Sequence, residues 1–229
     1  MKNVSPSKLS SSELPANHPR SFRNRRRKRA FDLVWALGSL VVLSPLIVLS
    51  IIAVLIDDGW PVFFVQKRVG LNGRIFPFFK LRTMVRNAER LGAGYEIEAG
   101  DKRITRTGNF LRRWSLDELP QLLNVLRGEM SVVGPRPTLP YQVEAYTEHQ
   151  RRRLEALPGL TGLAQVSGRN SLSWPERIEL DIEYIDNYSF WLDMKIILRT
   201  FGILGDSEVV YGQGWAKKKG DPGFRDKTE

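Results

Sequence analysis

The sequence predicts an α+β fold, mainly helical, in which an N-terminal membrane helix is joined to one domain that carries a small β-hairpin. Three observations predict it: an uncharged apolar run of 24 residues, a single hairpin signal, and apolar residues at helical spacing through much of the remaining chain. The chain has 229 residues, which is enough for one hydrophobic core together with a membrane anchor.

The composition excludes several classes of site. The chain has no Cys and two His, which excludes disulfide scaffolds, thiolate nucleophiles and Cys-ligated metal sites. Its net charge is +10, and residues 1–32 carry +7 of it. The near-neutral remainder lacks the broad basic face that nucleic acids need. We therefore expect membrane lipid headgroups, and no nucleic acid, to be the partner of the basic residues.

We expect residues 1–29 to form a disordered basic tail and residues 30–57 to form the membrane helix. The uncharged run within it, 33–56, would reach about 36 Å as a straight helix, enough to cross a hydrocarbon core of about 30 Å. Basic residues flank the run on both sides, which favours the cytoplasm for both ends. We therefore interpret the segment as a re-entrant helix broken at Ser44-Pro45, where the serine hydroxyl can satisfy a backbone group that the proline frees. A kinked helix that spans the bilayer is the alternative.

Residues 58–229 are interpreted as one cytoplasmic domain. β-Branched and aromatic runs on either side of Asn72-Gly73 predict a hairpin. Lys80 and Arg82 alternate along its second strand, so we expect both to point to one face. Helical spacing predicts helices over 109–114, 117–127, 141–157, 174–188 and 192–204. The last of these is amphipathic, so it either packs on the core or lies on the membrane surface as an interfacial helix.

The stretch from residue 111 to 137 contains two adjacent carboxylates, Asp117 and Glu118. They are bracketed by the arginines Arg112, Arg113, Arg127 and Arg136. Ser115 followed by Glu118 is typical of a capping box, a purely structural role that Pro120 partly opposes. In the functional alternative, one carboxylate attacks phosphorus while the other helps to hold Mg²⁺, which needs one or two carboxylates plus phosphate oxygens. The arginines would then neutralise a diphosphate.

A glycine-rich stretch, PGLTGLAQVSGRN at 158–170, closes on Arg169. Glycines let backbone amides approach an anion closely, and Arg169 would add a charged fork. An ordinary cluster of turns between helices is the alternative explanation.

The chain resembles the bacterial sugar transferases called small monotopic phosphoglycosyl transferases. The resemblance covers about residues 28–204 and rests on five segments in the same order: KRAFDLVWALGSLVVLSP, FKLRTM, SLDELPQLLNVLRGEMSVVGPRP, PGLTGLAQVSGR and a D-x-x-Y…S-x-x-x-D pattern (Asp181, Tyr184, Ser189, Asp193). Such enzymes move a phosphosugar from a UDP-sugar to a polyprenyl phosphate, usually undecaprenyl phosphate, and release UMP. They act at the cytoplasmic face of the bacterial inner membrane, in the first membrane step of glycoconjugate or exopolysaccharide synthesis.

The resemblance implies roles for individual residues. Asp117 would be the nucleophile of a ping-pong mechanism with a covalent phosphosugar intermediate, and Glu118 would support Mg²⁺ binding or proton handling. The Ser44-Pro45 step matches the helix break of the family. The residues that the resemblance assigns to substrate binding are Lys80, Arg82, Arg112, Arg136 and Arg169.

Other functions stay open at this point. A membrane-tethered basic module without chemistry would explain the charged N-terminus. A glycosyltransferase that releases UDP instead of UMP would use the same donors. The sequence identifies neither the sugar nor the oligomeric state, and a homodimer is one option.

Overall fold

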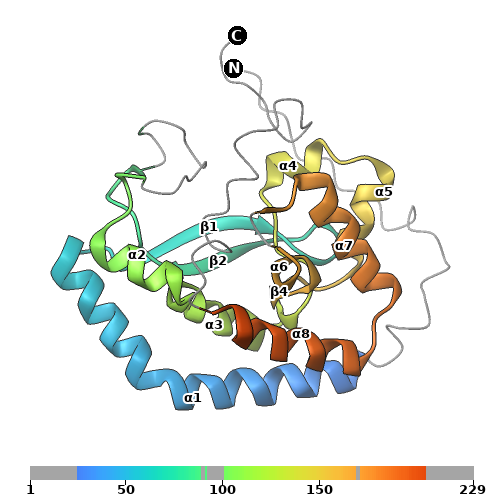
Figure 1. The fold of residues 1–229 in the computed structure, drawn as a ribbon, viewed down its shortest axis with the longest axis horizontal. Coiled ribbons are helices and arrows are strands. Elements are labelled where there is room, and N and C mark those ends of the chain that lie inside the picture. Colours follow the sequence, from blue (N-terminus) through green and yellow to red (C-terminus); the bar gives the residue numbers. More distant parts are fainter. Residues whose placement is uncertain (1–24, 89–90, 92–100, 169–170, 205–229) are drawn as a thin grey trace, which may run out of the picture.

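The structure is a computed structural model that describes residues 25–88, 91, 101–168 and 171–204. The first 24 residues of the predicted tail, Arg169 and residues 205–229 lie outside the described residues. One long helix, α1, runs along one side of a domain built from short helices and two small sheets (Figure 1). The predicted mainly helical α+β class is confirmed.

Helix α1, Arg25–Asp58, is longer than predicted because it begins inside the basic cluster. Within the described ranges it is the one helix that is long and apolar enough to cross a membrane, judged by length and composition. Only 11% of its most apolar window is buried. Side chains such as Val34 and Val42 are about three-quarters exposed, at 74% and 75%. The domain therefore leaves most of the apolar surface of α1 uncovered.

Pro45 lies inside α1, and Figure 1 shows the helix bent into two arms. Ser44 Oγ donates a hydrogen bond of 2.8 Å to the carbonyl of Val41. That carbonyl lies four residues before Pro45, which has no N–H to bond it. The predicted role of the serine hydroxyl is confirmed. The predicted break is instead a bend within a continuous helix, because the freed carbonyl has found a donor.

The predicted hairpin is confirmed. Strands β1, Phe63–Val69, and β2, Ile75–Leu81, pair antiparallel through a short 3-10 turn, η2, Leu71–Gly73. Asn72 and Gly73 both have positive φ, 54° and 76°, as the sequence signal requires. One face of the sheet packs inward through Phe76 and Phe78.

The rest of the domain consists of short helices and a second, parallel strand pair. The elements are α2 (Arg106–Arg113), η4 (Leu116–Gln121), α3 (Leu122–Arg127), β3 (Ser131–Val133), α4 (Pro140–Glu144), α5 (Glu148–Arg151), η5 (Arg152–Glu155), β4 (Gly159–Thr161), α6 (Leu163–Val166), α7 (Trp174–Asp186) and α8 (Phe190–Ile203). The single helix predicted over 141–157 is wrong, since this stretch is divided into α4, α5 and η5. Thr147 caps a new helix there by accepting a hydrogen bond from the N–H of Gln150.

Strands β3 and β4 bring two separate motifs together. Gly134 donates its N–H to Thr161 O at 2.9 Å, and Gly159 donates to Pro135 O at 2.9 Å. A Cβ on Gly162 would lie 2.2 Å from the Gly134 carbonyl oxygen. Gly159 and Gly162 therefore allow the backbones of the two motifs to pack closely.

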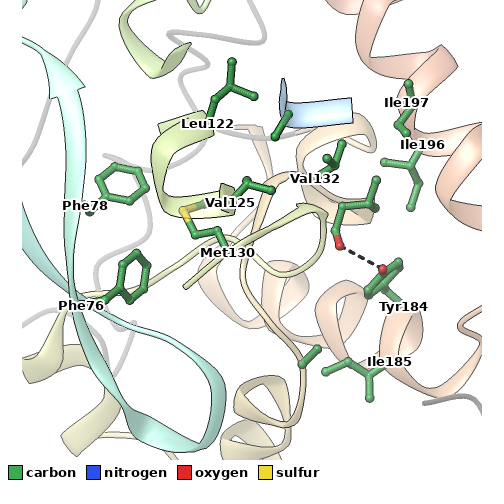
Figure 2. Packing of buried hydrophobic residues seen from close by; sticks show 13 residues of the cluster. Phe76, Phe78, Leu122, Val125, Met130, Val132, Tyr184, Ile185, Ile196 and Ile197 are labelled. Carbon is green, nitrogen blue, oxygen red and sulfur yellow. Dashed lines mark hydrogen bonds between the residues drawn. The ribbon is translucent and has the colours of Figure 1, made fainter. Parts of the chain in front are cut away.

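The main core lies between β2, α3, β3, α7 and α8. Figure 2 shows its side chains converging from these elements, with the hydroxyl oxygen of Tyr184 lying 3.1 Å from Val133 O. Its buried residues include Phe76, Phe78, Leu122, Val125, Met130, Ile185 and Ile196. Helix α8 belongs to this core, as its apolar spacing predicts. It also keeps Trp191 and Leu198 exposed at 74% and 71%, so it presents a second apolar face outward.

The first turns of α1 are fixed to the domain by polar contacts. Lys28 Nζ lies 2.7 Å from Asp193 Oδ2, and Arg29 donates to the carbonyl of Leu126 at 2.8 Å. Asp32, itself 1% exposed, accepts hydrogen bonds from the Ser131 hydroxyl and the Val132 N–H, both at 3.0 Å. Two of the cations expected at lipid headgroups thus face the protein, because positions 28, 29 and 32 fall on the side of α1 that meets the domain.

The other end of α1 is fixed to the same domain. Asp58 pairs with Arg82 at 2.8 Å, and Asp57 accepts from the Thr107 N–H at 2.8 Å. Val54 packs in a small buried cluster with residues of the hairpin and α2. Both arms of the bent helix therefore end on one folded body.

Candidate active site

Asp117 and Glu118 lie in η4, at the point where the chain turns from α2 into α3. Both are buried, with 2% and 9% of their surface exposed. Ser115 produces the turn by adopting a left-handed conformation, with φ 54°. Buried carboxylates require compensation by cations or hydrogen bonds, so their partners define the site.

The capping box that the sequence allowed at this point does not form. Ser115 makes no side-chain capping hydrogen bond. The N–H of Glu118 bonds to the backbone carbonyl of Ser115 at 3.2 Å, which is an ordinary turn contact. The purely structural interpretation of the two acids is therefore wrong in this form, because their side chains face cations.

Lys80 is the first of these cations and comes from β2. Its Nζ lies 3.0 Å from Asp117 Oδ2 and 3.3 Å from Glu118 Oε1. The Lys80 side chain is 21% exposed, so the ammonium is screened from bulk water without being sealed off. Strand β2 thus places one ammonium group in contact with both carboxylates. A lysine on an exposed strand face would ordinarily be solvated.

Arg136 is the second cation and follows β3. Its Nη2 lies 2.7 Å from Glu118 Oε1. The charge of Glu118 raises the pKa of Arg136, so the guanidinium stays protonated. Two carboxylates and two cations balance one another locally. Arg136 is also the more accessible of the two cations, with 36% of its side chain exposed, and it can turn donors toward an anionic ligand.

A buried arginine holds the backbone at Arg136. Arg153 donates to the Arg136 carbonyl at 3.1 Å and to the Tyr146 hydroxyl at 2.6 Å, and it forms an ion pair with Asp181. Its guanidinium lies 5.2 Å from the ring centre of Trp174. Burial raises the pKa of Asp181 to about 6, against the opposing charge of Arg153.

Sequence reasoning missed Arg153, which lay inside a stretch predicted as one ordinary helix. Asp181 was noted only as part of the family pattern. A buried Arg has no local sequence signature, but the T-x-x-Q capping signal at Thr147 would have divided that stretch.

The remaining predicted site residues have other printed partners or lie outside the described ranges. Arg112 Nε donates to Thr83 Oγ1 at 2.7 Å. Arg82 follows the end of β2, and its Nη2 donates to the carbonyls of Asp58 and Gly59 at 2.7 and 2.8 Å. Lys80 and Arg82 therefore do not serve one surface as expected, because the strand ends between them. Arg169 lies outside the described residues.

The described residues offer a divalent ion two carboxylates. No group of three or more His, Cys, Asp or Glu that could hold a metal occurs among them. Asp117 and Glu118 are adjacent, buried and already in contact with cations. This set fits Mg²⁺ only if phosphate oxygens and water complete its shell.

The chain is similar to known transferases over most of its length. The profile of the family described as bacterial sugar transferase matches residues 23–206. An uncharacterized sugar transferase, EpsL, of Bacillus subtilis is 47% identical over 76% of this chain and 84% of its own length.

Two longer relatives carry names that state an activity. The undecaprenyl-phosphate glucose phosphotransferase of Komagataeibacter xylinus is 45% identical over 76% of this chain and 35% of its own length. The undecaprenyl-phosphate galactose phosphotransferase of Salmonella typhimurium is 40% identical over 77% of this chain and 40% of its own length. The match covers well over half of the chain, and this protein therefore belongs to the bacterial sugar transferase family.

Proposed function

We propose that this protein transfers a phosphosugar from a UDP-sugar to undecaprenyl phosphate and releases UMP. The observation that carries the proposal is the pair of buried carboxylates, Asp117 and Glu118, bridged by Lys80 Nζ at 3.0 and 3.3 Å. Membership of the sugar transferase family and the names of its undecaprenyl-phosphate phosphotransferase relatives support it. The family match also disfavours a basic binding module without chemistry.

In the first half-reaction, a carboxylate oxygen of Asp117 attacks the sugar-bearing phosphorus of the donor. The bond between this phosphorus and the bridging diphosphate oxygen breaks, and UMP leaves with the bonding electrons. The product is a phosphosugar held on Asp117 as an acyl phosphate. Asp117 suits this role because it contacts Lys80, while Glu118 contacts both Lys80 and Arg136.

In the second half-reaction, a phosphate oxygen of undecaprenyl phosphate attacks the same phosphorus. The bond from phosphorus to Asp117 breaks, which restores the carboxylate and forms the lipid diphosphate sugar. Donor and acceptor react in turn with the same residue, Asp117, through one covalent intermediate, so the kinetics are ping-pong. Each covalent step exchanges one phosphorus–oxygen bond for another and needs no oxidant or reductant.

The cations contribute charge where the phosphates bind. Arg136 is held on the Glu118 carboxylate and part of its side chain is exposed, so its guanidinium can bind a diphosphate oxygen as a fork. Lys80 stabilises the negative charge on Asp117 before attack and on the departing phosphate afterwards. Arg112 and Arg169 are the further residues proposed to bind the diphosphate and the nucleotide, and Arg82 belongs to the basic strand motif of the same proposal.

Mg²⁺ is the proposed cofactor, and Asp117 and Glu118 are the residues that would hold it. Bound there with phosphate oxygens, the ion would neutralise diphosphate charge and polarise the phosphorus under attack. Lys80 contacts the same two carboxylates, so it would compensate their charge where the ion is not bound.

The proposed location is the cytoplasmic face of the bacterial inner membrane, with α1 as a re-entrant, monotopic anchor. Its two ends contact one domain, through Lys28 and Asp193 at the start and Asp58 and Arg82 at the end. A spanning helix would separate its ends by the bilayer thickness, about 30 Å, and place them on opposite sides. The bend at Pro45 lets both ends return to the same side.

Exposed apolar side chains beyond α1 support the same placement. On α8 they are Trp191, Leu198 and Phe201, with 74%, 71% and 61% of their surface exposed. The ring of Phe190, at the start of α8, lies 5.5 Å edge-on from that of Phe31 in α1. An apolar surface continuing from α1 onto α8 suits an interfacial helix that brings the site to the level of the acceptor phosphate.

The test is a nucleotide-release screen. The purified full-length protein in lipid nanodiscs is incubated with undecaprenyl phosphate, Mg²⁺ and each of a panel of UDP-sugars, including hexoses and N-acetylated sugars. We expect UMP from at least one donor. Release of UDP would assign a glycosyltransferase instead, and release of neither nucleotide from any donor would refute both enzyme assignments.

A further inference from the structure

Asn124, in α3, is fully buried against the strand that carries Lys80. Its amide nitrogen donates to Pro77 O at 2.7 Å and to Glu129 Oε2 at 2.6 Å. Its amide oxygen accepts from the N–H of Phe79 at 3.4 Å. The side chain therefore uses both of its N–H donors and its acceptor, and two of the three bonds go to the backbone of β2.

These two backbone groups belong to the edge of β2 that faces away from β1. In the described part of the chain, β2 pairs with β1 alone, so its other edge has no neighbouring strand. A carbonyl at one residue and the N–H two residues later point to the same side of a strand. The amide of Asn124 bonds to such a pair, at Pro77 and Phe79, and so occupies the place of a third strand.

The bonds of Asn124 join β2, which carries Lys80, to α3, which continues from the carboxylate segment η4. The separation of these two segments sets the distance from the Lys80 ammonium to the carboxylates. Lys80 follows Phe79 directly, and α3 continues from η4, which carries Asp117. Arg127 adds a second contact between α3 and this strand, with its guanidinium 5.0 Å from the ring centre of Phe79. A shift of β2 along α3 would move the Lys80 ammonium relative to Asp117.

We propose that Asn124 is a positioning residue, which fixes β2 against η4 and α3 so that the Lys80 ammonium lies between Asp117 and Glu118. Asn124 itself is not placed at the reacting atoms. The consequence for turnover rests on the proposed function, whereas the positioning of Lys80 does not.

The chemistry of the contact explains why an amide stands at this position. Aspartate has the same shape but no donor, so it would face Pro77 O and the Glu129 carboxylate with acceptors only. Buried acceptors that face one another are destabilising, and the strand would be pushed away. Asn124→Asp is therefore the substitution that breaks the contact with the smallest change in volume.

The experiment measures the reactivity of Lys80 in the full-length protein without any substrate. The protein in nanodiscs is acetylated with a water-soluble succinimidyl ester, and modification of Lys80 is followed over time by peptide mass spectrometry. We expect Asn124→Asp to raise the rate at Lys80 about tenfold, since an ammonium displaced from its carboxylates is open to the reagent. Asn124→Ala, which adds no buried charge, carries the same expectation if the first variant does not fold.

Two further variants separate positioning from stability. Ile178→Ala empties a fully buried site in the separate cluster around Val143, and it should lower the melting temperature without changing Lys80 labelling. The double variant combines Asn124→Asp with Glu129→Gln. The side-chain amide at position 129 can then donate to the carboxylate at position 124, which restores the bond between these two side chains. Pro77 O is still left without a donor. Melting temperature should recover in this double variant while Lys80 labelling stays high.

Three outcomes would overturn the inference. The first is an unchanged rate of Lys80 labelling in a folded Asn124 variant, and the second is an increased rate in Ile178→Ala. The third is a double variant in which both the labelling rate and the melting temperature return to the wild-type values. As a second readout, Asn124→Asp should lower kcat for UMP release about tenfold with KM for the donor nearly unchanged. If the wild-type protein releases no UMP, the proposed function fails, and the labelling result still decides the role of Asn124.

Discussion

Lys28 Nζ lies 2.7 Å from Asp193 Oδ2, and this ion pair joins the start of α1 to α8, 165 positions further along the chain. The two side chains are 12% and 1% exposed. Tyr184 donates its hydroxyl to the other carboxylate oxygen of Asp193 at 2.8 Å. Burial raises the pKa of Asp193, and Lys28 opposes that shift. Helix α1 and the domain are therefore held together by a charge pair that neither could bury alone.

Lys28→Met should destabilise the folded protein by about 3–5 kcal/mol, the usual effect of removing one partner of a buried pair. Asp193 would be left charged in an apolar place or forced to take up a proton. The free energy of unfolding in detergent micelles measures the loss, and Lys28→Arg, which keeps the charge, should recover most of it. A Lys28→Met protein within about 1 kcal/mol of the wild type would show that the pair contributes little.

Asp117→Asn should abolish transfer, with UMP release lowered by about three orders of magnitude or more, since the amide is no nucleophile toward phosphorus. Folding and membrane association should be retained. Asp186→Asn on the surface of α7 is the matched control and should keep full activity. Incubation of the wild type with radiolabelled UDP-sugar, without acceptor, should leave label on the protein. Turnover by Asp117→Asn would remove Asp117 as the nucleophile.

Asp181 should give the stability of the protein a characteristic pH dependence. Burial raises its pKa from 3.8 to about 6, so between these values the folded protein holds a proton that the unfolded chain has released. The stability contributed by this proton is present near pH 4 and is lost as the pH rises through 6. Asp181→Asn removes the titration.

The wild type should therefore lose unfolding free energy relative to Asp181→Asn as the pH rises from 3.8 to about 6. Denaturant titrations at a series of pH values measure it. Parallel stability curves for the two proteins would contradict the assignment. The variant should also be less stable overall at neutral pH, because Arg153 loses its ion-pair partner.

The re-entrant placement of α1 makes a labelling prediction that is simple to read, because the chain contains no native Cys. Single cysteines at Arg27 and Glu179 should both resist an impermeant maleimide in intact cells and both react after the inner membrane is opened. A cysteine at Val42, in the exposed middle of α1, should stay unreactive in either case. Labelling of Arg27→Cys alone in intact cells would establish a spanning helix.

Features encoded by neighbouring residues were predictable from the sequence. The hairpin followed from Asn72-Gly73, whose backbone angles are local, and the long apolar helix followed from its hydropathy. Pro45 and the Ser44 hydroxyl bond were predictable as well, but a break was expected where the helix in fact continues through a bend. The proposal that Asp117 and Glu118 are site residues depended on the family resemblance. Their spacing alone was also explained by a capping box.

Features that depend on distant contacts were not predictable. Lys80 reaches Asp117 across 37 positions, and nothing in either segment alone distinguishes this lysine from a solvated one. Strands β3 and β4 have three residues each, too few for any periodicity to show. The inward turn of Lys28 and Arg29 likewise depends on α8 and α3, which the basic cluster itself does not indicate.

The fixing of α1 to the domain has a consequence for the order in which the protein is made. A ribosome delivers α1 first, yet the partners of Asp32 lie 99 and 100 positions later and that of Lys28 lies 165 positions later. In the proposed placement, the helix meets the membrane while these polar groups still lack their partners, and headgroups and water have to satisfy them in the meantime. The contact of Lys28 with Asp193 forms only when α8 has been synthesised and has docked. A shortened chain that ends before Asp193 would lack this contact between α1 and the domain.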